Sequence, residues 1–219
     1  MVRKLKVNTF LTLDGVMQAP GGPDEDRSGG FEHGGWSAGY WDDQMGEVMT
    51  EFMGKPFDML LGRKTYEIFA AHWPHSTEPG ADQLNSARKH VASRTLKSVD
   101  WNNSELIKGD VAKFVADLKQ GSGPEIQVHG SGNLLQTLLR NDLIDELSLW
   151  TFPLVLGTGK RLFADGTVPA GLKLEAVTTS STGVVMARYE RAGAIKYGSF
   201  ALEQPSDAEA ERRQEVASS

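Results

Sequence analysis

The chain has 219 residues, enough for one large domain with a sizeable core. It contains no cysteine, which excludes disulfides, cysteine nucleophiles and thiolate zinc sites and leads us to expect a cytoplasmic protein. The net charge is −6, and five acidic and two basic side chains in residues 203–219 account for half of it. The remainder is too weakly charged to indicate a nucleic-acid binder. There is no run of eighteen apolar residues, and no long apolar core or cleavage site follows the basic start, so we expect neither a membrane span nor a signal peptide.

The first third of the chain predicts a strand, a long loop, a helix and a second strand. Residues 5–13 are rich in apolar and β-branched side chains, which is typical of a strand. Residues 18–35 are dense in Gly, Pro and Asp, and a loop of this length in a compact domain is usually functional or mobile. Apolar residues then recur at the helical period over residues 37–53, with Ser37 as the expected cap. An apolar run at 57–61 predicts the next strand, and a helix is expected over 64–71.

Strands and helices alternate through the middle of the chain. We expect strands at 90–93, 105–107, 125–128 and 145–152, helices at 110–120 and after Gly132, and a hairpin of 172–180 with 184–190. This alternation predicts an α/β fold with a mostly parallel twisted sheet, helices on both faces and an antiparallel C-terminal hairpin. We expect one domain over residues 1–192 and a partly disordered C-terminal extension over 193–219.

Three short segments stand where a predicted strand ends, at the edge of a parallel sheet where ligands bind. They are Gly62, Arg63, Lys64 and Thr65; Ser93, Arg94 and Thr95; and Gly130, Ser131, Gly132, Asn133 and Leu134. Glycine before a helix exposes peptide N–H groups that attract phosphate, and basic and hydroxyl side chains add donors. Each segment alone also fits an ordinary turn with solvated charges, and the third lacks the last glycine of the Rossmann dinucleotide fingerprint.

Together with two further stretches, these segments resemble the dihydrofolate reductase-like superfamily over residues 4–190. The further stretches are Thr12-Leu13-Asp14-Gly15-Val16 and residues 143–163, which include Leu143-Ile144-Asp145-Glu146-Leu147 and Pro153-Leu154-Val155-Leu156-Gly157-Thr158-Gly159. The chain is most similar to the C-terminal reductase domain of bifunctional riboflavin-biosynthesis deaminase/reductases and its stand-alone relatives. The resemblance implies a three-layer dihydrofolate reductase-like fold and a homodimer.

The resemblance also implies NADPH as the cofactor and hydride transfer to a carbon–nitrogen double bond. The segments 62–65 and 130–134 would hold the pyrophosphate, and Ser93 and Arg94 would meet the phosphate on the adenosine ribose. The loop with Asp14 and Val16 would close near the nicotinamide. Two departures bear on the substrate. A run of glycines is replaced by Gly130-Ser131-Gly132, and Gln44 stands where dihydrofolate reductase places an acidic residue, which weighs against folate.

Reduction of an imine needs a proton as well as a hydride, and the predicted helix 37–53 offers three carboxylates. Asp43 is the first candidate to organise the proton, directly or through water, and Asp42 and Glu47 follow. The alternative for each is an acidic helix surface. Trp36 and Trp41, beside the long loop, are the tryptophans expected to contact ligand.

Two other pairs of residues have a possible binding role. Lys160 and Arg161 follow a glycine-rich loop, so they either meet a substrate phosphate or are solvated charges. His72 and His75 are not expected to bind a metal, because the residues between them break a helix and no acidic partner is adjacent.

These observations favour an NADPH-dependent reductase with a small-molecule substrate, similar to 5-amino-6-(5-phosphoribosylamino)uracil reductase of riboflavin biosynthesis. Deaminase activity in this chain is excluded, because the zinc site of that chemistry uses Cys-x-x-Cys. Two alternatives stay open. One is an NADPH reductase acting on another pterin-like or carbonyl compound, and the other is a nucleotide-binding sensor without turnover.

Overall fold

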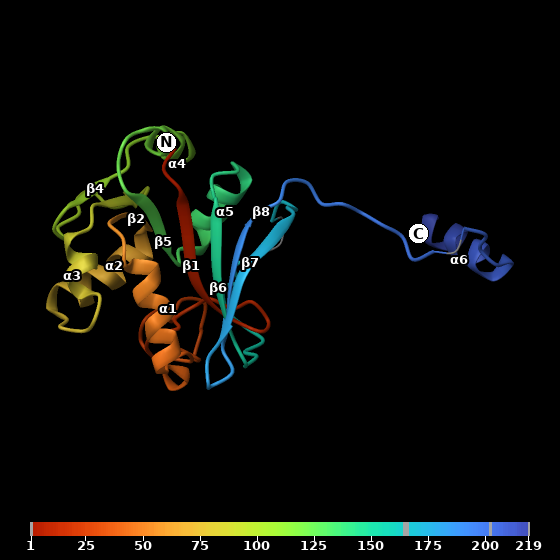
Figure 1. Ribbon diagram of the computed structural model, residues 1–219, viewed down its shortest axis with the longest axis horizontal. Helices are drawn as coiled ribbons and strands as arrows, with labels where there is room; N and C mark the ends of the chain where they lie inside the picture. Colours follow the sequence, from red (N-terminus) through yellow and green to blue (C-terminus); the bar gives the residue numbers. More distant parts are fainter. Residues whose placement is uncertain (1, 164–166, 202, 219) are drawn as a thin grey trace.

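The computed structural model describes residues 2–163, 167–201 and 203–218, and within them eight strands form one sheet. The strands are β1 (Leu5–Thr12), β2 (Phe57–Gly62), β3 (Lys89–Ala92), β4 (Ser104–Leu106), β5 (Glu125–His129), β6 (Glu146–Phe152), β7 (Leu172–Thr179) and β8 (Val185–Arg191). Their order is β4-β3-β2-β5-β1-β6-β8-β7 (Figure 1). Neighbours from β4 to β6 pair in parallel, whereas β8 pairs antiparallel with β6 and β7. The predicted parallel sheet with an antiparallel C-terminal hairpin is therefore confirmed.

Helices cover both faces of this sheet. The helices are α1 (Asp43–Met53), α2 (Arg63–His72), α3 (Ala81–Ser86), α4 (Val111–Gln120), α5 (Gly132–Arg140) and α6 (Asp207–Ala217). Apolar residues of α4 and α5 share one core with β1 and β5, while those of α1, α2 and α3 pack against the opposite face. The expected three-layer architecture is thus confirmed. Beyond β8 an extended segment leads to α6, which lies away from the sheet (Figure 1).

The strand β1 shows how the sequence pattern builds these layers. Because successive strand side chains point to opposite faces, Leu5, Val7 and Leu11 enter the core beneath α5. Phe10 faces the other way and packs on Trp150, with ring centroids 5.1 Å apart. No helix in the described part of the chain combines the length and apolar character that a membrane crossing requires.

The start of the first long helix differs from the prediction. A 3-10 turn covers Ala38–Tyr40, and α1 begins only at Asp43. Ser37 does not cap it, because its hydroxyl donates to the Pro20 carbonyl at 2.8 Å. The cap is Asp42, whose carboxylate accepts the Met45 N–H at 2.9 Å. A carboxylate is a stronger acceptor for a helix start than a hydroxyl already engaged elsewhere.

A buried lysine anchors the start of β3. The Lys89 ammonium donates to the carbonyls of Asn85, Ala87 and Asn102 at 2.7, 2.9 and 3.0 Å, and lies 4.1 Å from the ring centroid of Trp101. An ammonium has three donors, so this arrangement satisfies all of them away from water. Lys89 therefore ties β3 to the end of α3 and to the segment before β4.

Candidate functional site

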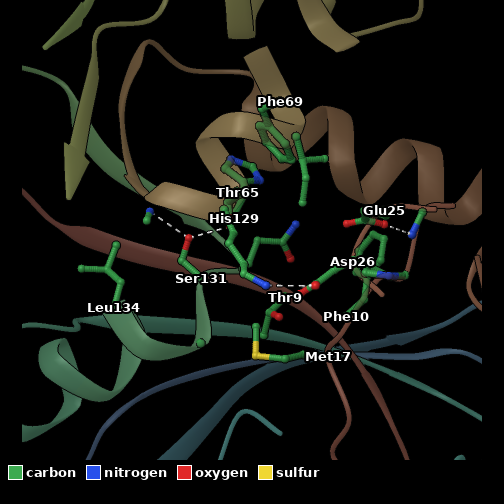
Figure 2. A pocket seen from close by; sticks show the side chains of 18 of the residues that line it. Thr9, Phe10, Met17, Glu25, Asp26, Thr65, Phe69, His129, Ser131 and Leu134 are labelled. Atoms are coloured by element: carbon green, nitrogen blue, oxygen red, sulfur yellow. Dashed lines mark hydrogen bonds and ion pairs between the residues drawn. The ribbon is translucent and has the colours of Figure 1, made fainter. Parts of the chain in front are cut away.

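A cavity of about 2730 Å³ opens at the carboxyl ends of β1, β2, β3 and β5. Open parallel sheets bind ligands at this edge. Pockets for one drug-sized molecule span about 300–1,000 Å³, so this cavity has room for a dinucleotide together with a second small molecule. Figure 2 shows part of its lining, with Ser131 and Leu134 on one side and Glu25 on the other.

Two of the three predicted phosphate segments meet in this cavity. The Ser131 hydroxyl accepts the Gly62 N–H at 2.9 Å and donates to the Thr65 hydroxyl at 2.8 Å, so it joins the start of α2 to the start of α5 (Figure 2). A side chain at Gly62 would bring its Cβ within 3.1 Å of Ser131 Oγ, so glycine allows this close approach. Ser131 itself has a left-handed backbone, with φ 69° and ψ 61°.

The helix starts at this junction differ from those of α1, α4 and α6, which have side-chain caps. Asp42 and Asp110 cap α1 and α4 with their carboxylates. Neither α2, after Gly62, nor α5, after Ser131, has a side-chain cap. Peptide N–H groups at a helix start attract anions when no side chain satisfies them. The arrangement is suited to a ligand that carries two linked phosphates, and the binding roles of both segments stay a prediction.

The third predicted segment lies at the end of β3 and lines the same cavity. The Ser93 hydroxyl accepts the N–H groups of Thr95 and Leu96 at 3.1 and 2.9 Å, which shapes the turn. Arg94 is exposed and has no ion pair within the described residues. Arg63, in contrast, donates to both carboxylate oxygens of Glu67 at 3.0 Å. Arg94 is therefore the arginine of these segments that is available to an anionic ligand.

The loop after β1 contributes other residues than those predicted. Asp14 and Val16 do not line the cavity, whereas Met17 and Gln18 do. The Asp14 carboxylate accepts from the Thr12 hydroxyl at 2.5 Å and from the Gly157 N–H at 2.8 Å. These hydrogen bonds, the one from Thr12 above all, lower the pKa of Asp14 to about 2. Asp14 thus joins two loops, which is a structural role.

The three carboxylates predicted to organise a proton do not line the cavity. Asp42 caps α1 and also accepts the N–H and hydroxyl of Ser181, each at 2.7 Å. The hydrogen bond from Met45, followed by that from Ser181, lowers the pKa of Asp42. Asp43 and Glu47 are exposed. The side of α1 that does line the cavity carries Gly46, Met49, Thr50 and Met53.

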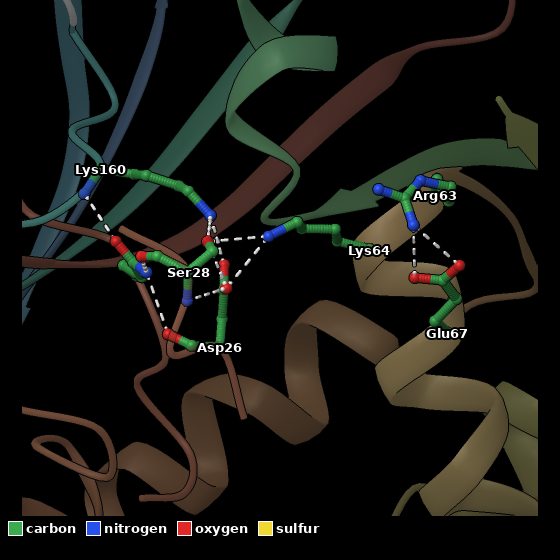
Figure 3. Close-up of polar contacts among 7 residues, drawn as sticks. Asp26, Ser28, Arg63, Lys64, Glu67 and Lys160 are labelled. Atoms are coloured by element: carbon green, nitrogen blue, oxygen red, sulfur yellow. Dashed lines mark hydrogen bonds and ion pairs between the residues drawn. The ribbon is translucent and has the colours of Figure 1, made fainter. Parts of the chain in front are cut away.

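The long loop 18–35 is fastened across the cavity by Asp26 (Figure 3). Its carboxylate pairs with Lys64 of α2 at 3.1 Å and with Lys160, which follows β6. The Ser28 hydroxyl accepts from the same two ammonium groups, at 2.8 and 2.6 Å. Burial opposes ionisation of Asp26, but these cations and Ser28 outweigh it and hold the pKa of the carboxyl well below its usual range.

Both basic residues that follow β6 are therefore engaged within the protein. Lys160 is held by Asp26, and Arg161 donates to the Asp14 carbonyl at 2.8 Å. Of the two tryptophans expected to contact ligand, Trp41 lines the cavity, whereas Trp36 donates to the Gln18 carbonyl at 2.8 Å and supports the loop. Among the described residues no cluster of three or more His, Asp and Glu side chains could hold a metal ion.

Two polar residues on the cavity wall escaped the sequence reasoning. Asn8, in the middle of β1, and His129, the last residue of β5, are direct partners in the sheet, and both line the cavity. Rings of Phe52, Phe57 and Phe69 surround the imidazole, with centroids 5.8, 6.4 and 6.2 Å away. Burial lowers the pKa of His129 to about 4, so the ring is neutral at pH 7. The sequence offered one indication of this site, the position of His129 directly before Gly130.

The chain resembles known proteins over most of its length. Residues 3–186 match the RibD C-terminal domain. The uncharacterized protein YyaP of Bacillus subtilis (strain 168) is 29% identical over 192 residues, which cover 85% of this chain and 94% of that protein. A solved structure from Shewanella sp. PV-4, provisionally assigned to riboflavin biosynthesis, has a TM-score of 0.61 at 21% identity and covers 87% of this chain and 99% of its own.

A second solved structure has a longer chain. The diaminohydroxyphosphoribosylaminopyrimidine deaminase/5-amino-6-(5-phosphoribosylamino)uracil reductase of Thermotoga maritima has a TM-score of 0.57 at 15% identity. The match covers 87% of this chain and 57% of that one. At this identity the likeness shows the fold. The family match over residues 3–186 carries the assignment. The chain therefore belongs to the RibD C-terminal domain family, as its sequence motifs predicted.

Proposed function

We propose that the protein is an NADPH-dependent reductase that transfers a hydride to a carbon–nitrogen double bond of a small heterocyclic substrate. The observation that carries the proposal is the junction of two uncapped helix starts, joined by Ser131, in a cavity large enough for two ligands. The membership in the RibD C-terminal domain family supports a reaction like that named for the Thermotoga protein, the reduction of a phosphoribosylamino-uracil.

The residues present fit the proposed cofactor. The starts of α2 and α5 offer peptide N–H groups for a pyrophosphate, and Lys64 stands beside the first of them. Ser93 and Arg94 are placed on the same cavity for a phosphate monoester. Reduced NADPH supplies the hydride when bound. The aromatic and thioether side chains of Phe10, Met17 and Met49 line the cavity and would exclude water from the reacting atoms.

Arg94 provides the sharpest test of the cofactor. We expect Arg94→Ala to weaken NADPH binding by about 1.5–3 kcal/mol, roughly ten- to a hundredfold, because a charged hydrogen bond to the 2′-phosphate is lost. NADH, which lacks that phosphate, should bind almost unchanged. Titration calorimetry with both cofactors measures the two losses. Arg88→Ala is the control, because it removes an exposed cation at the other end of β3 that does not line the cavity.

Turnover is tested separately. NADPH oxidation should be followed with a panel of ribosylamino-pyrimidine, pterin, imine and carbonyl compounds, and we expect reduction of at least one C=N compound. If the protein binds NADPH but oxidises none with any compound, the sensor alternative is favoured and the reductase proposal fails. Equal loss of NADPH and NADH affinity in the Arg94 variant would contradict its role at the 2′-phosphate. The homodimer stays a prediction, which light scattering would test.

A further inference from the structure

The carboxyl groups of the cavity are not alike. Within the described residues, five of them line it: Asp24, Glu25, Asp26, Glu78 and Asp110. Asp24 pairs with Arg27 at 2.8 Å, and Asp26 pairs with two lysines. Asp110 caps α4, and Glu78 lies 3.7 Å from His72. Glu25 differs from all of them because, in the described structure, neither a cation nor a helix start holds its charge.

Glu25 is nevertheless held in place. Its Oε2 accepts the N–H groups of Gly21 and Gly22 at 2.6 and 3.2 Å. Within the described residues the other oxygen, Oε1, has no hydrogen bond. The side chain is half-buried and lies across the pocket from Ser131 (Figure 2). Glu25 thus presents one oxygen to the cavity while the loop fixes the other.

The environment of Glu25 favours the protonated, neutral form of its carboxyl. Burial raises the pKa of the Glu25 carboxyl, although the two peptide N–H groups oppose the shift, and the charge on Asp26 raises it further. The cations around this loop are engaged by other carboxylates: Arg27 pairs with Asp24, and Lys64 of α2 and Lys160 after β6 pair with Asp26. The side of α1 that lines the cavity has no charged side chain, and His129 of β5 is neutral at pH 7.

We propose that Glu25 is the catalytic acid of this site and delivers the proton to the nitrogen of the C=N bond. This inference rests on the proposed function. As the carbon receives the hydride and its electron pair from the reduced nicotinamide, the π electrons of the double bond form the new N–H bond with the Glu25 proton. A C–H and an N–H bond replace the π bond. Glu25 is left as a carboxylate, which regains a proton from water.

Other acids are less suited to this step. The carboxylates of α1 do not line the cavity, as described above. Asp26 is fixed as an anion by two lysines, so it has no proton to give. The neutral imidazole of His129 is a weak acid and suits a hydrogen bond to substrate better than proton transfer. Among the described residues that line the cavity, Glu25 is the carboxyl whose pKa burial raises and whose charge neither a cation nor a helix start balances.

Glu25→Gln tests the proposal with little risk to the fold, because an amide oxygen still accepts the N–H groups of Gly21 and Gly22. We expect kcat to fall about 100-fold or more, the usual contribution of a general acid, with the Kd for NADPH unchanged. The wild-type kcat should decrease as pH rises and the acid ionises, while the residual kcat of the variant is independent of pH there. Glu25→Asp should recover part of the activity. Glu32→Gln is the matched control, because Glu32 is exposed on the same loop and does not line the cavity.

A second readout needs no turnover. The folded protein binds the Glu25 proton more tightly than the unfolded chain, so the contribution of Glu25 to stability should be lost as pH rises above the ordinary carboxyl range. His129 contributes in the opposite direction in both proteins, so the readout is the difference in stability between the wild type and Glu25→Gln, which should fall over that range. If the wild type reduces a C=N substrate but Glu25→Gln keeps kcat within threefold and the same pH profile, the role of Glu25 is overturned and the reductase proposal survives. If the wild type reduces none of the panel, both proposals fall.

Discussion

Ser131 allows the junction of the two helix starts to be tested by a pair of substitutions. Its side chain accepts from Gly62 and donates to Thr65, while its backbone occupies the left-handed region with φ 69°. Ser131→Ala removes both hydrogen bonds and keeps the strained backbone. Ser131→Gly removes the same hydrogen bonds and relieves the strain, since glycine adopts this conformation freely. The difference in the free energy of unfolding between the two variants therefore measures the effect of the Ser131 backbone conformation separately from that of its side-chain hydrogen bonds.

The magnitudes follow from these contacts. Two hydrogen bonds at 2.9 and 2.8 Å contribute about 0.5–1.5 kcal/mol each, so Ser131→Ala should lower the free energy of unfolding by about 2 kcal/mol. A left-handed residue other than glycine costs about 1–2 kcal/mol, and the greater freedom of glycine in the unfolded chain takes back about 0.4–1 kcal/mol. Ser131→Gly should accordingly be more stable than Ser131→Ala by about 1 kcal/mol.

Urea unfolding at equilibrium measures both free energies. With a slope of about 2 kcal/mol per molar urea, the two variants should differ in midpoint by about 0.5 M. Both should lose NADPH affinity by a similar factor in calorimetry, because neither joins α2 to α5. Equal midpoints for the two variants would refute the assignment of strain to Ser131. If Ser131→Gly binds NADPH as tightly as the wild type, the role of the Ser131 hydroxyl in the cofactor site is refuted.

Three further changes test the environment of the site. Lys89→Met should lower the free energy of unfolding by about 2–4 kcal/mol, because three carbonyl acceptors lose their donor; a loss below 1 kcal/mol in urea unfolding would contradict this. His129 has a folded pKa of about 4 and an ordinary value of 6.5, so the unfolded state binds more protons and stability should fall by about 3 kcal/mol as pH drops from 6.5 to 4. His129→Gln should remove most of that slope in urea unfolding at several pH values, and an unchanged slope would exclude His129 as its source. Asp26→Asn should speed trypsin cleavage after Arg27 about fivefold, because about 1 kcal/mol of loop attachment is lost; the Glu32→Gln control should match the wild type, and equal rates for both variants would contradict the fastening role.

The sequence alone predicted the layers of the fold and the two glycine segments that meet in the cavity. Strands and helices were identified from local periodicity, and the glycine segments at 62 and 130 from the chemistry of a strand end that turns into a helix. Both signals are local, because backbone conformation and side-chain spacing are set within a few residues. The sequence also indicated that residues 18–35 form a loop that is functional or mobile, but not its conformation.

The choice of the proton donor shows what local sequence patterns could not predict. Asp42 was a candidate for proton supply, yet it caps α1 and accepts from Ser181 in the turn between β7 and β8. Asp43 and Glu47 lie on the exposed side of α1. Which side of the helix faces the cavity depends on its rotation about its own axis, and the sequence pattern did not resolve that rotation. Glu25 had no distinguishing motif, because its burial depends on how an irregular loop folds back over the cavity.

Tertiary structure also decided which distant residues became neighbours. Asn8 and His129 stand side by side only because β1 and β5 are adjacent in the sheet, although the 120 residues 9–128 lie between them in the chain. Ser131 reaches Gly62 and Thr65 because β2 and β5 are paired. Composition and spacing determined what each segment could become. Strand order determined which segments share a cavity, since hydrogen bonds between strands act over space and leave no mark on the sequence between them.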